Sequence, residues 1–382
     1  MRILLVIDQY DNENNGTTIS AKRFAATLKD HGHDVRVVSM GKDDKSKYLV
    51  DELHIPLVSH IANKQGMSFA KPEESVLREA ISNCDIVHFY MPFPLAIKGL
   101  KIAKELGVPH TAAFHVQPEN ITYNAGLSRA NFVAEHIYEF YKKIFYDEFT
   151  HVHCPSDFIA GELKRHNYKA KLHVISNGVD PSFTYRKTDK NRELDNKFCI
   201  LMIGRLSNEK RQDVLIEAVK KSKYSDNIQL LFAGKGPKYE KYKELGSSLN
   251  NKPKFGFYSK EDLVKLISMC DLYVHSADIE IEAISCIEAF STGLVPIISN
   301  SSKSATKQFA LDGRSLFEHG NSEDLAKKID YWIEHEYERS VMEIKYSEYG
   351  RKFNIDSCVR KFEEMFMEAI DESKNYKVEK NG

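Results

Sequence analysis

Two glutamates in the second half of the chain, Glu280 and Glu288, have types and spacing that could hold a sugar and a ribose. If a helix begins near Ala283, Glu280 lies in the loop before it and Glu288 lies on its first or second turn. A carboxylate in the loop can accept hydrogen bonds from sugar hydroxyls, and one on the helix can accept both ribose hydroxyls. The free N–H groups at the start of the helix can bind a diphosphate. The competing interpretation is two solvated acids on an amphipathic helix.

Two basic residues stand close behind a buried apolar run. Phe198–Gly204 has the pattern of a buried parallel strand, and Arg205 and Lys210 follow it at a spacing of five residues. Both cations can reach an anion at the end of that strand, at about 1.5–3 kcal/mol for each charge-assisted contact. We expect a leaving diphosphate there, and the alternative is an ordinary basic surface loop.

Weaker signals come from glycines and from one histidine. Gly234 and Gly236 follow a strand and permit a close backbone approach, although a tight strand-to-helix turn explains them equally well. Gly16 closes the polar loop 9–15, where its N–H could meet phosphate or simply form a βα turn. His115 follows a strand in a loop with an amide and an acid, which suggests a recognition loop. The alternative is a histidine that packs beneath that loop.

Composition excludes several classes of protein. A chain of 382 residues is too long for one ordinary core, and its formal net charge of −1 gives no global field for nucleic acid. The six cysteines are scattered without a CxxC pair or a metal-ligand spacing, which favours reduced thiols in a reducing compartment. No stretch approaches the ~20 apolar residues of a membrane span, and the apolar run at the N-terminus is too short for a signal peptide. We therefore expect a cytoplasmic protein.

The elements that must position these residues alternate between strand and helix. Strands are predicted at 3–7, 35–38, 85–89, 110–114, 151–154, 171–175, 198–204, 229–234, 271–275 and 295–299, and helices at 19–31, 95–106 and 214–221. The pattern restarts after a polar stretch, so we predict two doubly wound α/β units with ligands at the carboxyl ends of their strands, in a cleft between them. The predicted parts are a domain at 1–180, a linker at 181–197, a domain at 198–350 and a helical tail at 351–382. In that tail, apolar residues recur at helical spacing, so it should dock.

The order and spacing of these motifs resemble the retaining family-4 glycosyltransferases of the GT-B fold, over nearly the whole chain. That resemblance predicts two Rossmann-like domains facing a cleft, with a C-terminal helix that returns to the N-terminal domain. The residues that carry it are Gly16, His115, Pro155-Ser156, Asn177-Gly178-Val179-Asp180, Gly204-Arg205-Leu206, Lys210, Gly234, Gly236, Glu280, Glu288, Gly293, Pro296, Ser315-Leu316-Phe317-Glu318 and Asp324-Leu325-Ala326.

The resemblance also implies roles, with four residues at the reacting centre. Arg205 and Lys210 would hold the donor diphosphate, Glu280 would contact the transferred sugar, and His115 would lie beside that sugar. The implied substrate-binding set is Gly16, Arg205, Lys210, Gly234, Gly236, Glu280, Ile281, Glu282, Ala283, Ile284 and Glu288, with Glu288 on the ribose and Gly16 giving a backbone contact to phosphate. No cofactor and no divalent metal are expected, because cations and helix N-termini replace the metal.

One departure from the family lies directly after the first glutamate. The family usually has glycine, an aromatic residue and glycine there, whereas this chain has Ile281, Glu282 and Ala283. The added acid could contact sugar hydroxyls or face solvent. We expect a distinct subfamily that retains activity.

The resemblance implies transfer of a hexose, UDP-glucose-like donors being favoured, to a cell-envelope acceptor such as diacylglycerol. Alternatives are a polysaccharide or polyprenyl-linked acceptor, a nucleotide-sugar epimerase of the same fold, and a non-catalytic partner protein that binds nucleotide sugar. Aromatic residues recur at helical spacing between Ile137 and Tyr146, beside Lys142 and Lys143. This segment is either an amphipathic helix at the anionic inner face of the cell membrane or a core helix, and both interpretations stay open.

Overall fold

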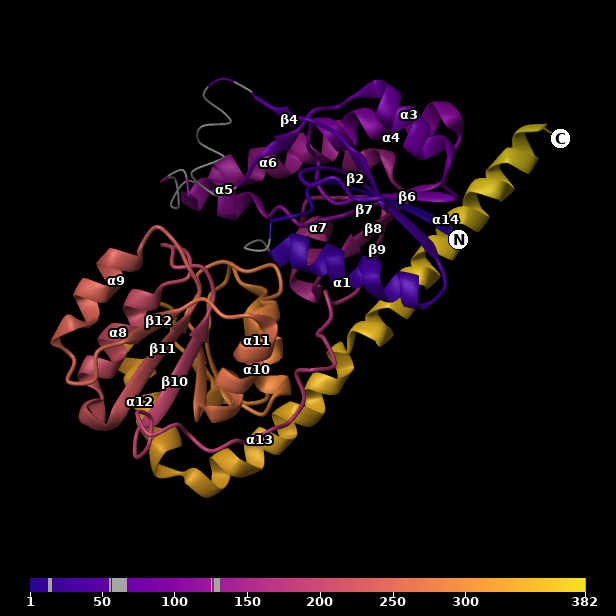
Figure 1. Ribbon diagram of the computed structural model, residues 1–382. Helices are drawn as coiled ribbons and strands as arrows, with labels where there is room; N and C mark the ends of the chain where they lie inside the picture. Colours follow the sequence, from indigo (N-terminus) through magenta and orange to yellow (C-terminus); the bar gives the residue numbers. More distant parts are fainter. Residues whose placement is uncertain (13–15, 55, 57–66, 125, 127–130, 382) are drawn as a thin grey trace. The chain divides into compact units, whose positions relative to one another are not determined.

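The chain folds into two compact α/β units, seen in a computed structural model that describes residues 1–12, 16–54, 56, 67–124, 126 and 131–381 (Figure 1). The first unit comprises Met1–Gly178 and Ile355–Gly382, and the second comprises Val179–Asn354. Positions 13–15 of the predicted glycine-containing loop lie outside the described residues.

The first unit is built on a seven-stranded sheet whose strands are all parallel, in the order β3-β2-β1-β6-β7-β8-β9. Its strands are β1 (Arg2–Gln9), β2 (Asp34–Met40), β3 (Lys47–Leu49), β6 (Ile86–Phe89), β7 (His110–Ala113), β8 (His151–Cys154) and β9 (Lys171–Val174), and β4 (Glu52–Leu53) pairs separately with β5 (Phe69–Ala70). Its helices are α1 (Gly16–Asp30), α3 (Glu74–Ser82), α4 (Pro94–Leu106), α5 (Pro118–Asn124), α6 (Asn131–Ile144), α7 (Asp157–Arg165) and α14 (Ile355–Asn381).

The second unit is built on a six-stranded parallel sheet in the order β12-β11-β10-β13-β14-β15. Its strands are β10 (Phe198–Ile203), β11 (Ile228–Ala233), β12 (Lys254–Gly256), β13 (Leu272–His275), β14 (Pro296–Ser299) and β15 (Leu316–Phe317). Its helices are α8 (Gln212–Lys221), α9 (Tyr239–Leu245), α10 (Lys260–Met269), α11 (Ile284–Ser291), α12 (Ser322–Glu334) and α13 (Glu336–Gly350). In Figure 1, α8 and α9 lie on one side of this sheet and α10 and α11 lie on the other.

The predicted strands of both halves are confirmed, and so is the doubly wound arrangement. Continuous apolar runs such as Phe198–Ile203 are buried because helices cover both faces of a parallel sheet. In the second sheet, the chain leaves β10 toward β11 on one side and returns to β13 on the other. The carboxyl ends of β10 and β13 therefore form a topological switch point, which is where open α/β sheets bind ligands.

The stretch 181–197, predicted to be a linker, packs on the second unit. Phe183 and Leu194 are buried in the core of that unit. The backbone N–H of Thr188 donates a hydrogen bond to the Ser268 carbonyl at 3.1 Å. The polar composition of this stretch predicted an interdomain linker. Two apolar side chains and a backbone hydrogen bond hold it against the unit that follows it.

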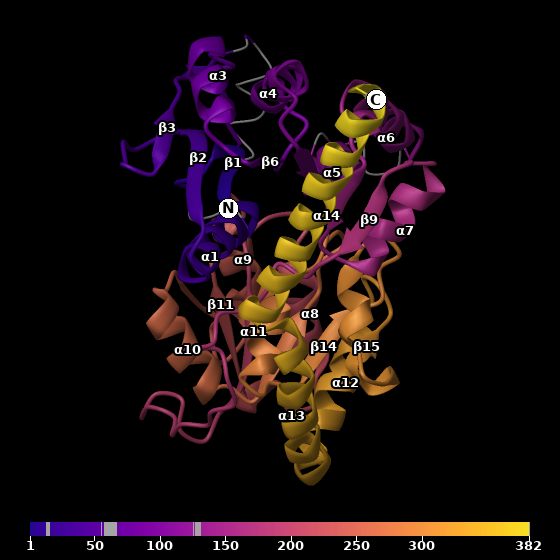
Figure 2. The same ribbon diagram turned by 90° about the vertical axis from the view of Figure 1, so that its right-hand side faces the viewer.

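The C-terminal helix α14 belongs to the first unit, as the family resemblance predicted, and its apolar spacing had predicted that it docks. It lies beside α1 (Figure 2), and Phe362 contacts Phe24 with ring centroids 4.6 Å apart. The His31 imidazole lies 2.8 Å from the carboxylates of both Asp356 and Glu363, and these hydrogen bonds raise the pKa of His31. Apolar packing and a charged contact together hold the last helix on a sheet formed far earlier in the chain.

The aromatic segment from Tyr138 to Tyr146 packs as core. Tyr138, Tyr141, Phe145 and Tyr146 are all buried, and the Tyr138 hydroxyl lies 3.1 Å from the Glu119 carboxylate. Phe140 faces the other way and is 56% exposed. None of the helices that the structure describes is both long enough and apolar enough to span a bilayer.

We predict that Phe362→Ala destabilises the protein by about 3–5 kcal/mol, because it removes a fully buried ring that contacts both α1 and the sheet. The matched control on the same helix is Met367→Ala, whose side chain is 45% exposed and should change the free energy of unfolding by less than about 1 kcal/mol. Urea unfolding measures both changes, and equal losses in the two variants would contradict the docking of α14.

Candidate functional site

The second unit brings its predicted site residues to the switch point of its sheet. Gly204 and Arg205 directly follow β10, and Lys210 lies five residues later, just before α8. Glu280 lies in the loop that follows β13. Residues about 70 positions apart in the sequence therefore meet because β10 and β13 are neighbouring parallel strands that end at one edge.

Glu280 is the most constrained of these residues. Its carboxylate accepts a hydrogen bond from the Lys210 ammonium and lies 3.0 Å from Nε2 of His275. Burial by itself raises the pKa of Glu280, but the Lys210 charge and the His275 hydrogen bond outweigh it and lower that pKa to about 2. Glu280 is therefore an anion at neutral pH and cannot serve as a proton donor there. Its backbone is also fixed, since its carbonyl accepts from the Ala305 N–H at 2.9 Å.

His275 is a site residue that sequence reasoning missed. It is the last residue of β13 and is 1% exposed. Its Nδ1 lies 3.0 Å from the Tyr273 hydroxyl, which in turn lies 3.2 Å from the Ser285 hydroxyl on α11. These contacts fix the imidazole so that Nε2 faces Glu280. The available signal was a buried histidine at the end of a strand, five residues before a candidate acid.

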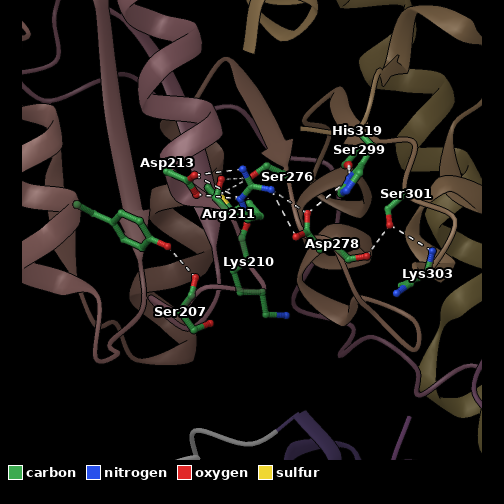
Figure 3. Close-up of polar contacts among 12 residues, drawn as sticks. Ser207, Lys210, Arg211, Asp213, Ser276, Asp278, Ser299, Ser301, Lys303 and His319 are labelled. Carbon is green, nitrogen blue, oxygen red and sulfur yellow. Dashed lines mark hydrogen bonds and ion pairs between the residues drawn. The ribbon is translucent and has the colours of Figure 1, made fainter. Parts of the chain in front are cut away.

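A second set of contacts holds the loop of Lys210 against the loop of Glu280 (Figure 3). The Arg211 guanidinium lies 3.4 Å from the Asp278 carboxylate. The Ser276 hydroxyl donates to the carbonyls of Lys210 and Arg211 at 3.0 and 2.8 Å. The Asp278 N–H donates to the Glu209 carbonyl at 2.8 Å. The two loops are thus joined through main chain and side chain, so the Lys210–Glu280 pair is held by its surroundings.

The two glycines after β11 have a packing role against the loop that follows β10. A Cβ at Gly234 would lie 2.0 Å from the Gly204 carbonyl oxygen, and one at Gly236 would lie 2.3 Å from the Leu206 carbonyl oxygen. Neither contact is possible for a real side chain. The glycines therefore let the loop after β11 pack on the loop that carries Arg205. They shape the predicted phosphate site through backbone packing, whatever contact they make with a ligand.

In the segment after Glu280, where the sequence departs from the family pattern, one residue keeps a backbone conformation that glycine usually adopts. Ala283 has φ 71° and ψ 67°, in the left-handed region, and immediately precedes α11. An L-residue in that region costs about 1–2 kcal/mol. Glu282 is 1% exposed, so the added acid does not face solvent. Ile281 is partly buried, and Ile284 begins α11.

Glu288 lies on the second turn of α11 and is 6% exposed. The predicted placement, with one glutamate in the loop before the helix and the other on it, is confirmed. A pair of solvated acids on an amphipathic face is excluded, because Glu280 and Glu288 are both buried.

The first unit contributes the other two predicted residues, each described within that unit. His115 lies just beyond β7 and is 6% exposed, and its ring stacks on Tyr90 with centroids 5.5 Å apart. Neither ring nitrogen of His115 has a hydrogen-bond partner among the described residues. Burial lowers the pKa of His115 well below its usual value, so the imidazole is neutral. Gly16 is exposed and begins α1.

The second unit can therefore bind an anion at Lys210, with the fixed carboxylate of Glu280 beside it, and Arg205 follows the same strand as Lys210. A buried polar group without a partner costs about 1–3 kcal/mol, so the nitrogens of His115 are suited to a polar ligand. Within the second unit, Lys210 and Glu280 can position a charged, hydroxyl-rich substrate and stabilise a leaving anion.

Two family models match the chain. The model described as Glycosyltransferase Family 4 matches residues 14–183, and the model described as Glycosyl transferases group 1 matches residues 185–353. Together they cover most of both units, but neither covers Ile355–Gly382 of the first unit.

Two curated relatives align over 78% of this chain. An alpha-monoglucosyldiacylglycerol synthase from Streptococcus pneumoniae is 24% identical over 71% of its own length. A GDP-mannose-dependent alpha-mannosyltransferase from Corynebacterium glutamicum is 26% identical over 72% of its own length.

Two solved structures are similar to this chain, and the first of them shares its architecture. Anabaena HepE, crystallised with UDP and glucose, superposes with a TM-score of 0.77 over 96% of this chain and 100% of its own, at 17% identity. The catalytic domain of a Helicobacter pylori cholesterol-alpha-glucosyltransferase is 49% identical over 41% of this chain and 99% of its own, with a TM-score of 0.38. By the two family models and by its two Rossmann-like units of the GT-B fold, the chain belongs to the group 1 and family 4 glycosyltransferases.

Proposed function

We propose that the protein transfers a hexose from a nucleoside diphosphate sugar, UDP-glucose in the first instance, to an envelope acceptor with retention of configuration. The observation that carries this proposal is the ionised Glu280 held by Lys210 at the switch point of the second sheet. In the proposal Glu280 accepts hydrogen bonds from the sugar, Glu288 accepts them from the ribose, and Arg205 and Lys210 hold the diphosphate. The ammonium of Lys210 has three donors, so it can keep Glu280 while it binds phosphate.

The proposed reaction is a front-side substitution at the anomeric carbon. The bond from that carbon to the leaving phosphate oxygen breaks, and a bond to the acceptor oxygen forms on the same face. The acceptor's hydroxyl proton goes to the leaving phosphate, which departs as the nucleoside diphosphate. Glu280 serves as a fixed negative charge beside an oxocarbenium-like state, and no side chain is assigned as a covalent nucleophile.

Three further assignments complete the proposal for the donor. His115 donates or accepts a hydrogen bond at the sugar, which satisfies a buried imidazole that has no partner among the described residues. Gly16 gives an N–H to phosphate at the start of α1. No divalent metal and no cofactor are required in this scheme, because Arg205 and Lys210 neutralise the diphosphate.

For the acceptor we propose a membrane glycolipid precursor, with diacylglycerol first. The name of the pneumococcal relative supports this choice, as does an exposed face of α6. Phe132 and Phe140 are 68% and 56% exposed at a spacing of eight residues, and Lys143 is exposed on the same helix. Such a face suits peripheral contact with an anionic cytoplasmic leaflet. A polysaccharide or polyprenyl-linked acceptor is the alternative.

A donor screen tests the function directly. The purified chain is incubated with UDP-glucose, UDP-galactose or GDP-mannose, with EDTA, and with diacylglycerol, a sterol or a polyprenyl phosphate in detergent. Release of nucleoside diphosphate, with a product of retained anomeric configuration by NMR, is expected for one donor. An isomerised donor would indicate an epimerase instead, and binding without turnover would indicate a non-catalytic partner protein.

Lys210→Ala should lower transfer by at least about 100-fold, because it removes both a phosphate contact and the counter-charge of Glu280. Lys303→Ala is a matched control, since this partly buried lysine lies in the same unit and carries no predicted donor contact. Turnover with UDP-glucose is the measurement, and near-normal transfer by Lys210→Ala would sink the assignment.

Replacing Phe132 and Phe140 together by serine should reduce co-sedimentation with anionic liposomes at low salt at least about fivefold, because both rings are exposed. Tyr337→Ser is the control, as its side chain is 81% exposed but lies in the second unit. Wild-type protein that stays in the supernatant would remove the argument for membrane contact.

A further inference from the structure

A cluster of ionisable side chains gathers where α14 crosses β8 and β9, in the first unit. His151 is the first residue of β8, and His173 lies on the neighbouring strand β9. Because His151 pairs with Lys171, two residues before His173, both histidines point to the same face of the sheet. Glu368 approaches that face from α14. These three residues are called the His151 cluster below.

The distances within the His151 cluster describe a nearly isosceles triangle. Nδ1 of His151 lies 2.9 Å from Nε2 of His173, and each nitrogen lies 3.9 Å from Oε2 of Glu368. A triangle with those sides has a circumscribed radius of about 2.1 Å, so one point lies about that far from all three atoms. Zinc bonds to histidine nitrogen and carboxylate oxygen have about the same length, 2.0–2.2 Å.

The environment of the cluster has other features of a metal site. Nε2 of His151, the nitrogen that faces away from the triangle, lies 2.9 Å from the Glu372 carboxylate. A carboxylate behind a ligating imidazole orients the ring and strengthens its basicity. The His151 side chain is fully buried, that of His173 is 12% exposed, and that of Glu368 is 43% exposed. The site is thus rigid on the sheet side and accessible from the helix side.

Direct hydrogen bonds between Glu368 and the two histidines do not explain the position of the Glu368 carboxylate. At 3.9 Å the Glu368 oxygen is too far to hydrogen-bond with either imidazole nitrogen. The two facing nitrogens share one proton, and Zn²⁺ bound at the point equidistant from the three donor atoms would release that proton to solvent. Lys171 competes for Glu368, since its ammonium lies 2.5 Å from the same oxygen. Its side chain is 58% exposed, so it can move away at little cost.

We propose that His151, His173 and Glu368 bind a Zn²⁺ ion, with a fourth position open to water. Two histidines and a carboxylate are a zinc donor set, and Mg²⁺ would prefer oxygen ligands. The ion would join α14 to β8 and β9 and so stabilise the docking of the last helix. Zn²⁺ that binds only the folded state raises the stability of that state in proportion to the logarithm of its concentration.

The test is isothermal titration of ZnCl₂ into the full-length, chelator-treated chain, together with thermal unfolding with and without Zn²⁺. One saturable equivalent of Zn²⁺ and a higher unfolding temperature are expected, and MgCl₂ should do neither. Glu368→Gln and His173→Gln should each weaken zinc binding at least about tenfold. Lys171→Ala should leave it equal or tighter, because a competing cation is removed.

His136→Gln is the matched control, an exposed histidine on α6 that bonds only its own helix at the Phe132 carbonyl. It should bind Zn²⁺ like the wild type. Unfolding of each variant without metal is measured first, and if His173→Gln does not fold, the half-exposed Glu368→Gln decides. The proposal is overturned if no saturable equivalent binds, or if binding is unchanged in Glu368→Gln.

Discussion

The site of the second unit depends on one partly buried ion pair, the Glu280 carboxylate against the Lys210 ammonium. A buried carboxylate without a partner would take up a proton, because desolvation disfavours its charge. Here the cation and the His275 hydrogen bond reverse that tendency and lower the pKa of Glu280 to about 2. Retaining a charge in a buried position is costly for folding. The chain keeps it where a donor sugar and its leaving phosphate would need one fixed anion and one fixed cation.

The rest of the unit can be understood as the means of bringing these two groups together. Lys210 follows β10 and Glu280 follows β13, so only the reversal of strand order places them at one edge. Gly234 and Gly236 allow the neighbouring loop to pack without a steric clash. Arg211 and Asp278 join the two loops a few residues from the pair. A change in any of these contacts would move Lys210 away from Glu280. The cost to stability is larger than for an exposed pair, because a buried charge would lose its partner.

Much of the fold could be predicted from the sequence, because buried parallel strands are continuous apolar runs that end in glycine or a polar loop. Phe198–Ile203 and the segments like it were located for that reason, and α14 for its helical apolar spacing. The packing of 181–197 on the second unit was not predicted, since Phe183 and Leu194 are isolated apolar residues in a polar stretch. His275 and the His151 cluster were missed for another reason. Their significance lies in the side chains they face, and no local pattern gives the partner of a single histidine.

At Ile281-Glu282-Ala283 the residue types depart from the family pattern, but the backbone conformation expected of that pattern is retained at Ala283. Ala283 stands where the resemblance predicts a glycine, and it adopts the left-handed conformation that glycine adopts easily. The backbone path into α11 is therefore kept at a cost of about 1–2 kcal/mol. This leaves Glu280 and the start of α11 where the proposed donor needs them.

The central claim is that the fixed charge of Glu280 acts on the donor sugar, and Glu280→Gln tests it most directly. Affinity for UDP and turnover of UDP-glucose are measured side by side in the variant and in the wild type. The account predicts that the dissociation constant for UDP stays within about threefold while transfer falls at least about 100-fold, because glutamine keeps the shape and loses the charge. Near-normal transfer by Glu280→Gln would contradict it.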